Sequence, residues 1–457
     1  MIMLTQKLAE FVISTSVSDL PRQALDGARD ALIDTIGCGL VGAQEEASRI
    51  VVDFLRAQGG NAQATVWGVG LATTASDAAF ANGVFTHALD YDDTQSNLRG
   101  HPSAALVPAI LAVGEYVHAS GLDALGAYAI GLEVAGKLGR AFGDGHYLHG
   151  WHATGTVGVF AATAATGRLL GLSVEELRRA LGIAASESSG LVRNFGTMTK
   201  PFNAGHAAKG GVIAAMLAKQ GFTADASIFD GTDGFLSIYG GGDGQPLGEL
   251  LGRLAQPWEI IQPGLFFKRW PCCYCNHRSI GGLLRMIPEH NLKPDEIEAI
   301  EIGFPPGSDA ALIANDPRTG LQGKFSIEYV AAATLLDGKV TLESFTDAMV
   351  NRPEVRRLMQ RVRRYRIEDS RTFAGTVGYN DITVRTTRGE FKMHVDKTPG
   401  SPAWPVSSDE RDQKFLDCAG RVLGGAEART LLDLLLNCRS LAEVGPLVRA
   451  TAPRMNP

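Results

Sequence analysis

One short stretch of the sequence concentrates the side chains that acid–base chemistry needs. It runs from His87 to Thr94, contains several aspartates, and is followed by His101. Asp90, Asp93 and Thr94 have the i, i+3, i+4 spacing that would place them on one face of a helix. Crowded carboxylates repel one another, which raises the pKa of one of them and makes it a useful base. The alternative is an ordinary helix C-terminus with solvated acids.

Two further segments add a histidine and cations. His152 precedes a long uncharged stretch rich in Ala, Gly and Thr, so we expect its imidazole at a helix N-terminus, where the neutral form is favoured. Arg193 and Lys200 follow, and because Lys200 directly precedes Pro201, we expect it on a loop rather than in a helix. From a loop, its ammonium could point into a cleft and pair with a substrate carboxylate. A capping histidine and a surface lysine are the alternatives.

The segment 268–278 places cations beside thiols. Cys272 and Cys275 have the C-x-x-C spacing of zinc and dithiol redox sites, but no second Cys/His pair with ligand spacing lies nearby. We therefore favour anion binding by this segment and keep zinc and dithiol chemistry as alternatives. Its cationic groups are Lys268, Arg269, His277 and Arg278.

The composition limits the kinds of partner. The chain has 457 residues and a formal net charge of −6, so it lacks the basic field that nucleic-acid binding requires. Its longest uncharged stretch of membrane-like length, 145–167, is built from His, Gly, Thr and Ala rather than Leu and Ile, which argues against a membrane span. Six scattered cysteines and the absence of a signal-peptide pattern argue against a secreted scaffold. We expect a cytoplasmic protein whose partners include neither nucleic acid nor membrane.

Several common catalytic motifs are absent from the sequence. It contains no G-x-G-x-x-G, P-loop, G-x-S-x-G or H-E-x-x-H pattern, so nicotinamide, nucleoside triphosphate, serine-hydrolase and zincin chemistry lose their support. What remains is a site of His, Asp, Lys and Arg without a cofactor or a metal. Such groups suit the abstraction of a proton from carbon in an anionic substrate, with cations stabilising the enolate.

The apolar periodicity predicts the elements that must position these side chains. From residue 4 to about 264 the pattern is helical. The clearest predicted helices are 75–88, 104–117, 124–142, 154–170, 173–186 and 206–220.

After residue 264 the pattern changes to alternation of apolar and polar residues, which is typical of strands with one buried face. The predicted strands are 297–302, 382–385 and 391–395, with a turn at 387–390 and helices at 329–336, 342–350 and 353–362. Residues 408–435 return to a helical pattern. We therefore predict a mainly α protein: a large helical domain from 1–265 plus 405–457, with an α+β lid domain, 266–404, inserted in it. The boundary between two such domains is a common place for a small-molecule site.

Together these segments resemble the MmgE/PrpD family, which includes 2-methylcitrate dehydratases, cis-aconitate decarboxylases and an iminodisuccinate epimerase. The resemblance runs nearly end to end. The matching stretches are 87–94, 101–103, 150–152, 194–201, 268–277 and 325–329. It implies a helical domain built from both chain ends with an α+β lid, a homodimer, an active site between the domains, and no metal or organic cofactor.

The resemblance also implies roles for individual residues. His101 would transfer the proton at carbon, with Asp90 and His152 assisting. Lys200, Lys268 and Tyr329 would hold the carboxylates of the substrate. The other residues expected to line the site or bind the substrate are Thr94, Arg193, Cys273 and His277.

These expectations combine into one leading function and several alternatives. We expect an enzyme that abstracts a proton α to a carboxylate in a small di- or tricarboxylate and eliminates water, as a 2-methylcitrate-type dehydratase does. Epimerisation of an iminodisuccinate-like dicarboxylate is the nearest alternative. Decarboxylation of the cis-aconitate type ranks lower, because the decarboxylase branch carries a histidine where this chain has Cys273, although His277 lies close by. A binding protein for polycarboxylates without turnover is the last alternative.

Overall fold

The computed structural model describes residues 3–371, 373 and 378–453, which belong to two compact units. The first unit comprises Met1–Val192, Lys200–Leu265 and Ser407–Pro457, and the second comprises Arg193–Thr199 and Phe266–Val406. We expected residues 193–199 in the helical domain, but they pack with the second unit. No helix within the described residues is both long enough and apolar enough to cross a membrane.

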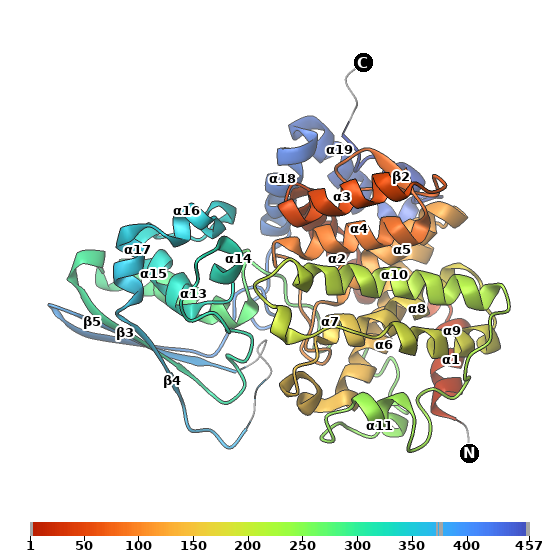
Figure 1. Cartoon of the computed structure of the whole chain (residues 1–457), viewed down its shortest axis with the longest axis horizontal. Coiled ribbons are helices and arrows are strands. Elements are labelled where there is room, and N and C mark those ends of the chain that lie inside the picture. Colours follow the sequence, from red (N-terminus) through yellow and green to blue (C-terminus); the bar gives the residue numbers. More distant parts are fainter. Residues whose placement is uncertain (1–2, 372, 374–377, 454–457) are drawn as a thin grey trace. The chain divides into compact units, whose positions relative to one another are not determined.

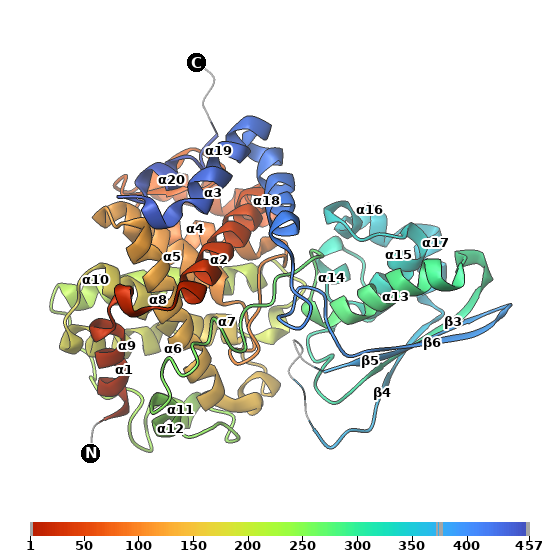
Figure 2. The same cartoon turned by 180° about the vertical axis from the view of Figure 1, so that it is seen from behind.

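Helices build most of the first unit, and helices from the two ends of the sequence pack together in it (Figure 1). They are α1 (Leu4–Ser14), α2 (Arg22–Gly42), α3 (Glu46–Gln58), α4 (Ala75–Ala88), α5 (Pro102–Val117), α6 (Gly121–Leu148), α7 (Ala153–Thr156), α8 (Gly158–Leu169), α9 (Val174–Glu187), α10 (Thr199–Lys219), α11 (Phe235–Tyr239), α12 (Leu247–Leu251), α18 (Ser408–Leu423), α19 (Gly425–Leu436) and α20 (Gly445–Arg449). In the core, α4 packs on α5, and both α5 and α6 pack on α8. The C-terminal helix α18 packs along α2, as Figure 2 shows.

A pair of glycines lets α4 and α10 approach each other closely. A side-chain carbon added at Gly83 would lie only 2.7 Å from the Cα atom of Gly205, so a larger residue at Gly83 would push the two backbones apart. His87 lies one turn beyond Gly83 on α4, and Lys200 lies in the first turn of α10. The close approach of the two helices therefore brings these two side chains within hydrogen-bonding reach.

The structure confirms a mainly α fold, and most predicted helices in the first unit agree with it. The expectation that Lys200 lies on a loop is wrong, because α10 begins at Thr199. Pro201 is tolerated there, since backbone N–H groups in a first turn have no partner within the helix. The predicted helix 408–435 is also interrupted: Gly424, with a φ of +88°, separates α18 from α19. The predicted helix 154–170 is divided into α7 and α8.

The second unit contains a four-stranded sheet in the order β4-β3-β5-β6. β3 is parallel to β4 and antiparallel to β5, and β5 and β6 form the predicted hairpin. α13 packs against β5 and β6, and α15 packs against β4. The elements are α13 (His277–His290), β3 (Ile297–Phe304), α14 (Gly320–Gly323), α15 (Ile327–Asp337), α16 (Asp347–Val350), α17 (Pro353–Met359), β4 (Val362–Arg366), β5 (Asn380–Thr386) and β6 (Gly389–Val395).

Three predictions for short elements are corrected by the structure. The predicted helix 353–362 ends at Met359, and the residues after it form β4, which sequence analysis missed because Val362 is the only buried residue of that strand. The predicted helix 342–350 is a 3₁₀ turn, Leu342–Phe345, followed by α16. A hairpin in the first unit, β1 (Ala64–Val66) with β2 (Leu71–Thr73), was also missed.

Candidate active site

An interlocked group of ionisable side chains lies where α4 ends and α5 begins. His87 is in the last turn of α4, and His101 is the N-cap residue of α5. Asp90 and Asp92 lie on the connecting loop. The helix ends because Asp90 adopts the left-handed conformation, with a φ of +52°, which an aspartate tolerates better than most residues. The prediction that Asp90, Asp93 and Thr94 share a helix face is therefore wrong.

Asp92 lies between two imidazole rings. Its Oδ1 atom is 2.9 Å from Nδ1 of His87, and its Oδ2 atom is 3.1 Å from Nδ1 of His101. The ring centroids of the two histidines are 4.4 Å apart. A carboxylate facing Nδ1 fixes the tautomer of a histidine, orients its ring and leaves Nε2 for proton transfer.

Lys200 joins the other side of this group. Its Nζ atom donates to Oδ1 of Asp90 and approaches Nε2 of His87, both at 2.7 Å. Oδ1 of Asp90 is in turn 3.7 Å from Nε2 of His101. The contacts therefore close a ring in the order His101, Asp92, His87, Lys200 and Asp90, which we call the proton ring. Of its members, His101 has the most accessible side chain, 12% exposed, whereas that of Asp92 is fully buried.

The surroundings set the charges within the proton ring. Burial alone would raise the pKa of Asp92, but the facing imidazoles of His87 and His101 hold it well below its usual range. Burial lowers the pKa of His87, and the charge of Asp92 only partly offsets that effect. His87 is therefore neutral, with its Nδ1 proton donated to Asp92 and its Nε2 lone pair facing the ammonium of Lys200.

His152 lies beside the proton ring. It is the N-cap residue of α7, and its ring stacks on that of His87 with centroids 5.8 Å apart. The side-chain amide of Asn203 donates to its Nδ1 atom at 3.1 Å. Burial, followed by the charge of Lys200, lowers the pKa of His152 well below its usual value. The expected neutral state of His152 is thus supported, but its main cause is burial rather than the helix terminus.

A lysine from the C-terminal part of the chain anchors the loop that carries the two aspartates. Nζ of Lys414, on α18, donates to the backbone carbonyl of Tyr91 at 2.8 Å and to Oδ1 of Asp34 at 2.7 Å. The same ammonium lies 3.8 Å from the centre of the Tyr91 ring, a cation–π contact. Because Tyr91 stands between Asp90 and Asp92, these contacts fix the backbone on which both carboxylates depend.

Asp93 faces away from the proton ring. The hydroxyl of Ser103 lies 2.5 Å from Oδ2 of Asp93 and 2.6 Å from the hydroxyl of Tyr128. Burial, followed by the charge of Asp34, raises the pKa of Asp93 well above its usual range. Its neighbour Thr94 is also buried, and its hydroxyl has no hydrogen-bond partner within the described residues.

Four of the residues that the first unit brings together were predicted from their types in the sequence. Asp90, His101 and Lys200 belong to the proton ring, and His152 stacks against it. His87 and Asp92 were not singled out, although both stand in the same aspartate-rich stretch, 87–94. Nothing in their spacing shows that they pair, because the five-residue separation is bridged only after α4 has ended at Ala88.

The second unit holds the remaining candidates. Lys268 and Cys273 are buried, and the backbone N–H of Cys273 donates to the carbonyl of Lys324. His277 begins α13, and its Nε2 atom is 3.1 Å from the carbonyl oxygen of Trp270.

Two more candidates in this unit differ in exposure. The buried hydroxyl of Tyr329 donates to the carbonyl of Ser344, and burial raises the pKa of this tyrosine. Arg193 is exposed on a 3₁₀ turn, Val192–Asn194. The roles of all these side chains in substrate binding stay predictions.

The proton ring also has the ligand types of a metal site. His87, Asp90, Asp92 and His101 offer ligand atoms that all lie within 4.8 Å of one another. However, the ammonium of Lys200 already lies against Nε2 of His87 and Oδ1 of Asp90, so a divalent ion would have to displace another cation. This geometry suits proton transfer and anion binding better than metal binding. The thiols of 272–275 join no such ligand group within the described residues.

Comparison with known families accounts for both units. The model for the MmgE/PrpD N-terminal domain matches residues 6–247, and the model for the MmgE/PrpD C-terminal domain matches residues 270–438. The chain belongs to the MmgE/PrpD family. The resemblance inferred from short segments is thereby confirmed over nearly the whole length.

Among known MmgE/PrpD proteins, several cis-aconitate decarboxylases are similar to this chain. It is 30% identical to the protein of Mus musculus and 29% identical to that of Homo sapiens, and both alignments cover 97% of this chain. They cover 92% of the mouse protein and 93% of the human one. The cis-aconitate decarboxylase of Aspergillus terreus is 26% identical, over 97% of this chain and 95% of that protein.

Proposed function

We propose that this MmgE/PrpD protein is a lyase that acts on a small polycarboxylate without a cofactor and moves one proton at a carbon α to a carboxylate. The proton ring is the observation that carries the proposal. It contains an imidazole, that of His101, which is oriented by the ionised Asp92 and is the most accessible member of the ring. A carboxylate in this position stabilises the imidazolium that forms when a histidine takes up a proton.

The proton ring supplies what two lyase reactions have in common. In decarboxylation, the bond between carbon and carboxylate breaks, CO₂ leaves, and the electron pair remains on carbon as an enolate that must accept one proton. In dehydration, a base removes the proton at carbon, and the hydroxide leaves from the neighbouring carbon with a proton from an acid. In either reaction His101 exchanges the carbon proton, and the ammonium of Lys200 offsets the negative charge that develops on the carboxylate.

Decarboxylation of a cis-aconitate-type tricarboxylate is the first reaction to test. The similar proteins of mouse, human and Aspergillus terreus are cis-aconitate decarboxylases, and the similarity extends over 97% of this chain. The expected 2-methylcitrate-type dehydration has no specific support from these relatives. It stays the second candidate because Cys273 stands where, by the family resemblance, the decarboxylase branch carries a histidine.

A substrate panel separates these reactions. The purified chain is incubated in deuterated water with cis-aconitate, 2-methylcitrate, citrate and an iminodisuccinate-like dicarboxylate, and products are followed by NMR. We expect release of CO₂ from cis-aconitate together with one deuterium on the product carbon. Formation of an alkene from 2-methylcitrate would assign the second candidate. If the iminodisuccinate-like dicarboxylate took up deuterium with inversion at carbon and no alkene formed, the chain would be assigned as an epimerase instead.

His101→Ala tests the role of the imidazole directly. We expect turnover to fall by about 10²–10⁴-fold, the usual contribution of a general acid or base, with a smaller change in KM. If turnover were unchanged in this variant, the proposed reaction would not take place at the proton ring. If the native chain binds a polycarboxylate but converts none of the panel, the lyase proposal is overturned in favour of a binding protein. The expected homodimer is a separate proposal, which light scattering of the purified chain tests.

A further inference from the structure

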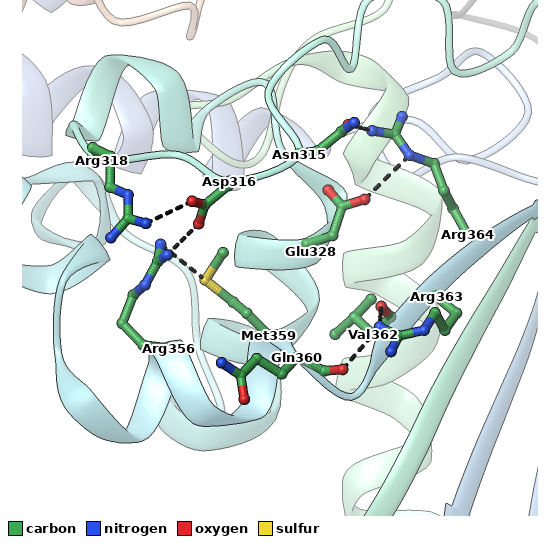
Figure 3. A pocket seen from close by; sticks show the side chains of 10 residues that line it. All are labelled: Asn315, Asp316, Arg318, Glu328, Arg356, Met359, Gln360, Val362, Arg363 and Arg364. Atoms are coloured by element: carbon green, nitrogen blue, oxygen red, sulfur yellow. Dashed lines mark hydrogen bonds and ion pairs between the residues drawn. The ribbon is translucent and has the colours of Figure 1, made fainter.

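Arginines dominate a pocket of the second unit that the proposed lyase reaction does not use. The pocket has a volume of about 590 Å³ and lies among α15, α17, β4 and the loop 315–318 (Figure 3). All of its lining residues belong to the second unit, and none is a member of the proton ring. The charged residues that line it are Asp316, Arg318, Glu328, Arg356, Arg363 and Arg364. Guanidinium groups thus outnumber carboxylates here, although the whole chain has a net charge of −6.

One side of the pocket holds two guanidinium groups on a single carboxylate. Arg318 and Arg356 both donate to Asp316, as Figure 3 shows. Arg356 also donates to the backbone carbonyl of Pro317 at 2.8 Å, so its position is fixed from two directions. A single carboxylate neutralises only one of these two cations, which leaves a positive charge at this wall.

The opposite side of the pocket holds two more arginines. Arg364 is held in position by its neighbours, whereas Arg363 has no carboxylate partner within the described residues. Nε of Arg364 lies 3.1 Å from Oε1 of Glu328, and its NH1 donates to the carbonyl of Leu312 at 2.8 Å. Arg363 donates only to the backbone carbonyls of Gln360 and Val362, and within the described residues no carboxylate pairs with it. Its remaining N–H donors face solvent, since the residue is exposed.

We propose that this pocket binds a compact, polyvalent phosphate-type anion. The planar fork of a guanidinium matches phosphate oxygens bidentately, and Arg356 and Arg364 are already held in place by their neighbours. A volume near 590 Å³ falls in the range of small-molecule sites. The lining contains no aromatic side chain on which a base could stack, so the anion itself, rather than a nucleoside, is the recognised group.

The sequence around the pocket supports attraction of such an anion. The segment 352–366 contains seven arginines and a single glutamate. Arg357 and Arg366 belong to it, are exposed and do not line the pocket. A concentration of one sign of charge raises the local concentration of a counter-ion and speeds its association. These outer arginines therefore steer the anion, whereas the lining arginines hold it.

Calorimetric titration of the whole chain with inorganic pyrophosphate, without divalent cations, tests the pocket. The double variant Arg318→Gln/Arg363→Gln removes two exposed lining cations, and we expect it to weaken binding at least tenfold. The matched control Arg357→Gln/Arg366→Gln removes the same charge outside the pocket, and we expect less than a threefold loss. Equal losses in both variants would mean diffuse electrostatic attraction and would overturn the site.

Two further outcomes decide where the anion binds. If the native chain does not bind pyrophosphate at millimolar concentration, the proposal is wrong. If the affinity is lost in Asp92→Asn or Lys200→Ala but kept in the lining variant, the anion binds at the proton ring, and the pocket is not its site. Because the titration measures no turnover, its result is independent of the proposed lyase reaction.

Discussion

The proton ring and the arginine pocket both gather ionisable side chains, but they differ in burial. In the proton ring, Lys200 and Asp90 have side chains that are only 4% exposed, and their charges meet at 2.7 Å. In the arginine pocket, Arg318 and Asp316 meet at a similar distance, 2.6 Å, with side chains 64% and 58% exposed. The two contacts look alike in geometry alone.

Burial makes the consequences of the two contacts different. Water and salt screen an exposed pair, so its net contribution to stability is small, whereas a buried charge that loses its partner is costly. Burial lowers the pKa values of His87 and His152, whereas the imidazoles of His87 and His101 hold the pKa of Asp92 low against the effect of burial. Perturbed pKa values of this kind are typical of sites that transfer protons. The first unit therefore has the features of a chemical site, and the second unit offers a screened surface suited to reversible anion binding.

The largest expected effect is that of Asp92→Asn on turnover. An amide cannot stabilise an imidazolium at His101, and it faces the Nδ1 protons of two histidines with only one acceptor atom. We expect kcat to fall by about 10²–10⁴-fold with a smaller change in KM. Steady-state kinetics with the substrate identified by the panel gives both constants.

The adjacent aspartate provides a control for that variant. Burial raises the pKa of Asp93, opposite to the shift at Asp92, and Asp93 accepts its hydrogen bonds from Ser103 rather than from a member of the proton ring, so Asp93→Asn should keep kcat within about threefold of the native value. Equal losses in the two variants would contradict the distinct roles that the geometry gives to these neighbours.

Replacing Lys200 should have the next largest effect, this time on stability. Lys200→Met leaves the buried carboxylate of Asp90 without its ammonium, which we expect to cost about 3 kcal/mol of unfolding free energy. Lys209 lies on the same helix and meets Asp77 at the same distance, 2.7 Å, but its side chain is 33% exposed. Lys209→Met should therefore cost less than about 1 kcal/mol. Denaturant unfolding of both variants measures the difference, and equal losses would contradict the argument from burial.

The same contrast explains what the sequence could predict. The helical domain, the inserted α+β block and the β5–β6 hairpin follow from periodicity, because burial of one face imposes a regular pattern over many residues. β4 was missed because its single buried residue, Val362, leaves no pattern. The predicted loop position of Lys200 was wrong. A residue that precedes a proline usually avoids the helical conformation, but proline is tolerated in the first turn of a helix, where Lys200 and Pro201 lie.

The site was predicted only as far as residue types could suggest it. His101, His152, Lys200 and Asp90 were chosen for their chemistry and their order along the chain, and the structure brings them together, while their roles stay predictions. His87 and Asp92 were passed over because their pairing depends on a helix that stops after Ala88 and on a loop anchored by Lys414 from the far end of the chain. Such long-range contacts leave no trace in local spacing.

A smaller effect, on stability at mildly acid pH, follows from the buried histidines. Burial lowers the pKa of His87 and His152, and it lowers that of His146 to about 4. A histidine in the unfolded chain takes up its proton at about pH 6.5, so these groups favour the folded state above that pH, and their contribution falls as the pH drops below it. We expect a loss of up to about 1.4 kcal/mol per pH unit for each group, measured by denaturant unfolding between pH 7.5 and 5.5.

One substitution sharpens this pH prediction. His146→Gln should reduce the slope of unfolding free energy against pH by the share of one histidine. An unfolding free energy that stays constant from pH 7.5 to 5.5 would mean that the buried histidines accept protons in the folded state.

The smallest expected effect concerns the stability of the arginine pocket itself. Arg318→Gln/Arg363→Gln should change the unfolding free energy by no more than about 0.5 kcal/mol, because both residues are exposed and water replaces the contacts they lose. Arg364→Gln makes a graded comparison, since its partner Glu328 has a side chain only 13% exposed, and we expect a loss of about 1–2 kcal/mol there. Denaturant unfolding at low and high salt measures both variants. A loss above 2 kcal/mol in the exposed double variant would show that these arginines hold the fold together, and the contrast with the buried proton ring would then fail, since exposed and buried charges would contribute alike.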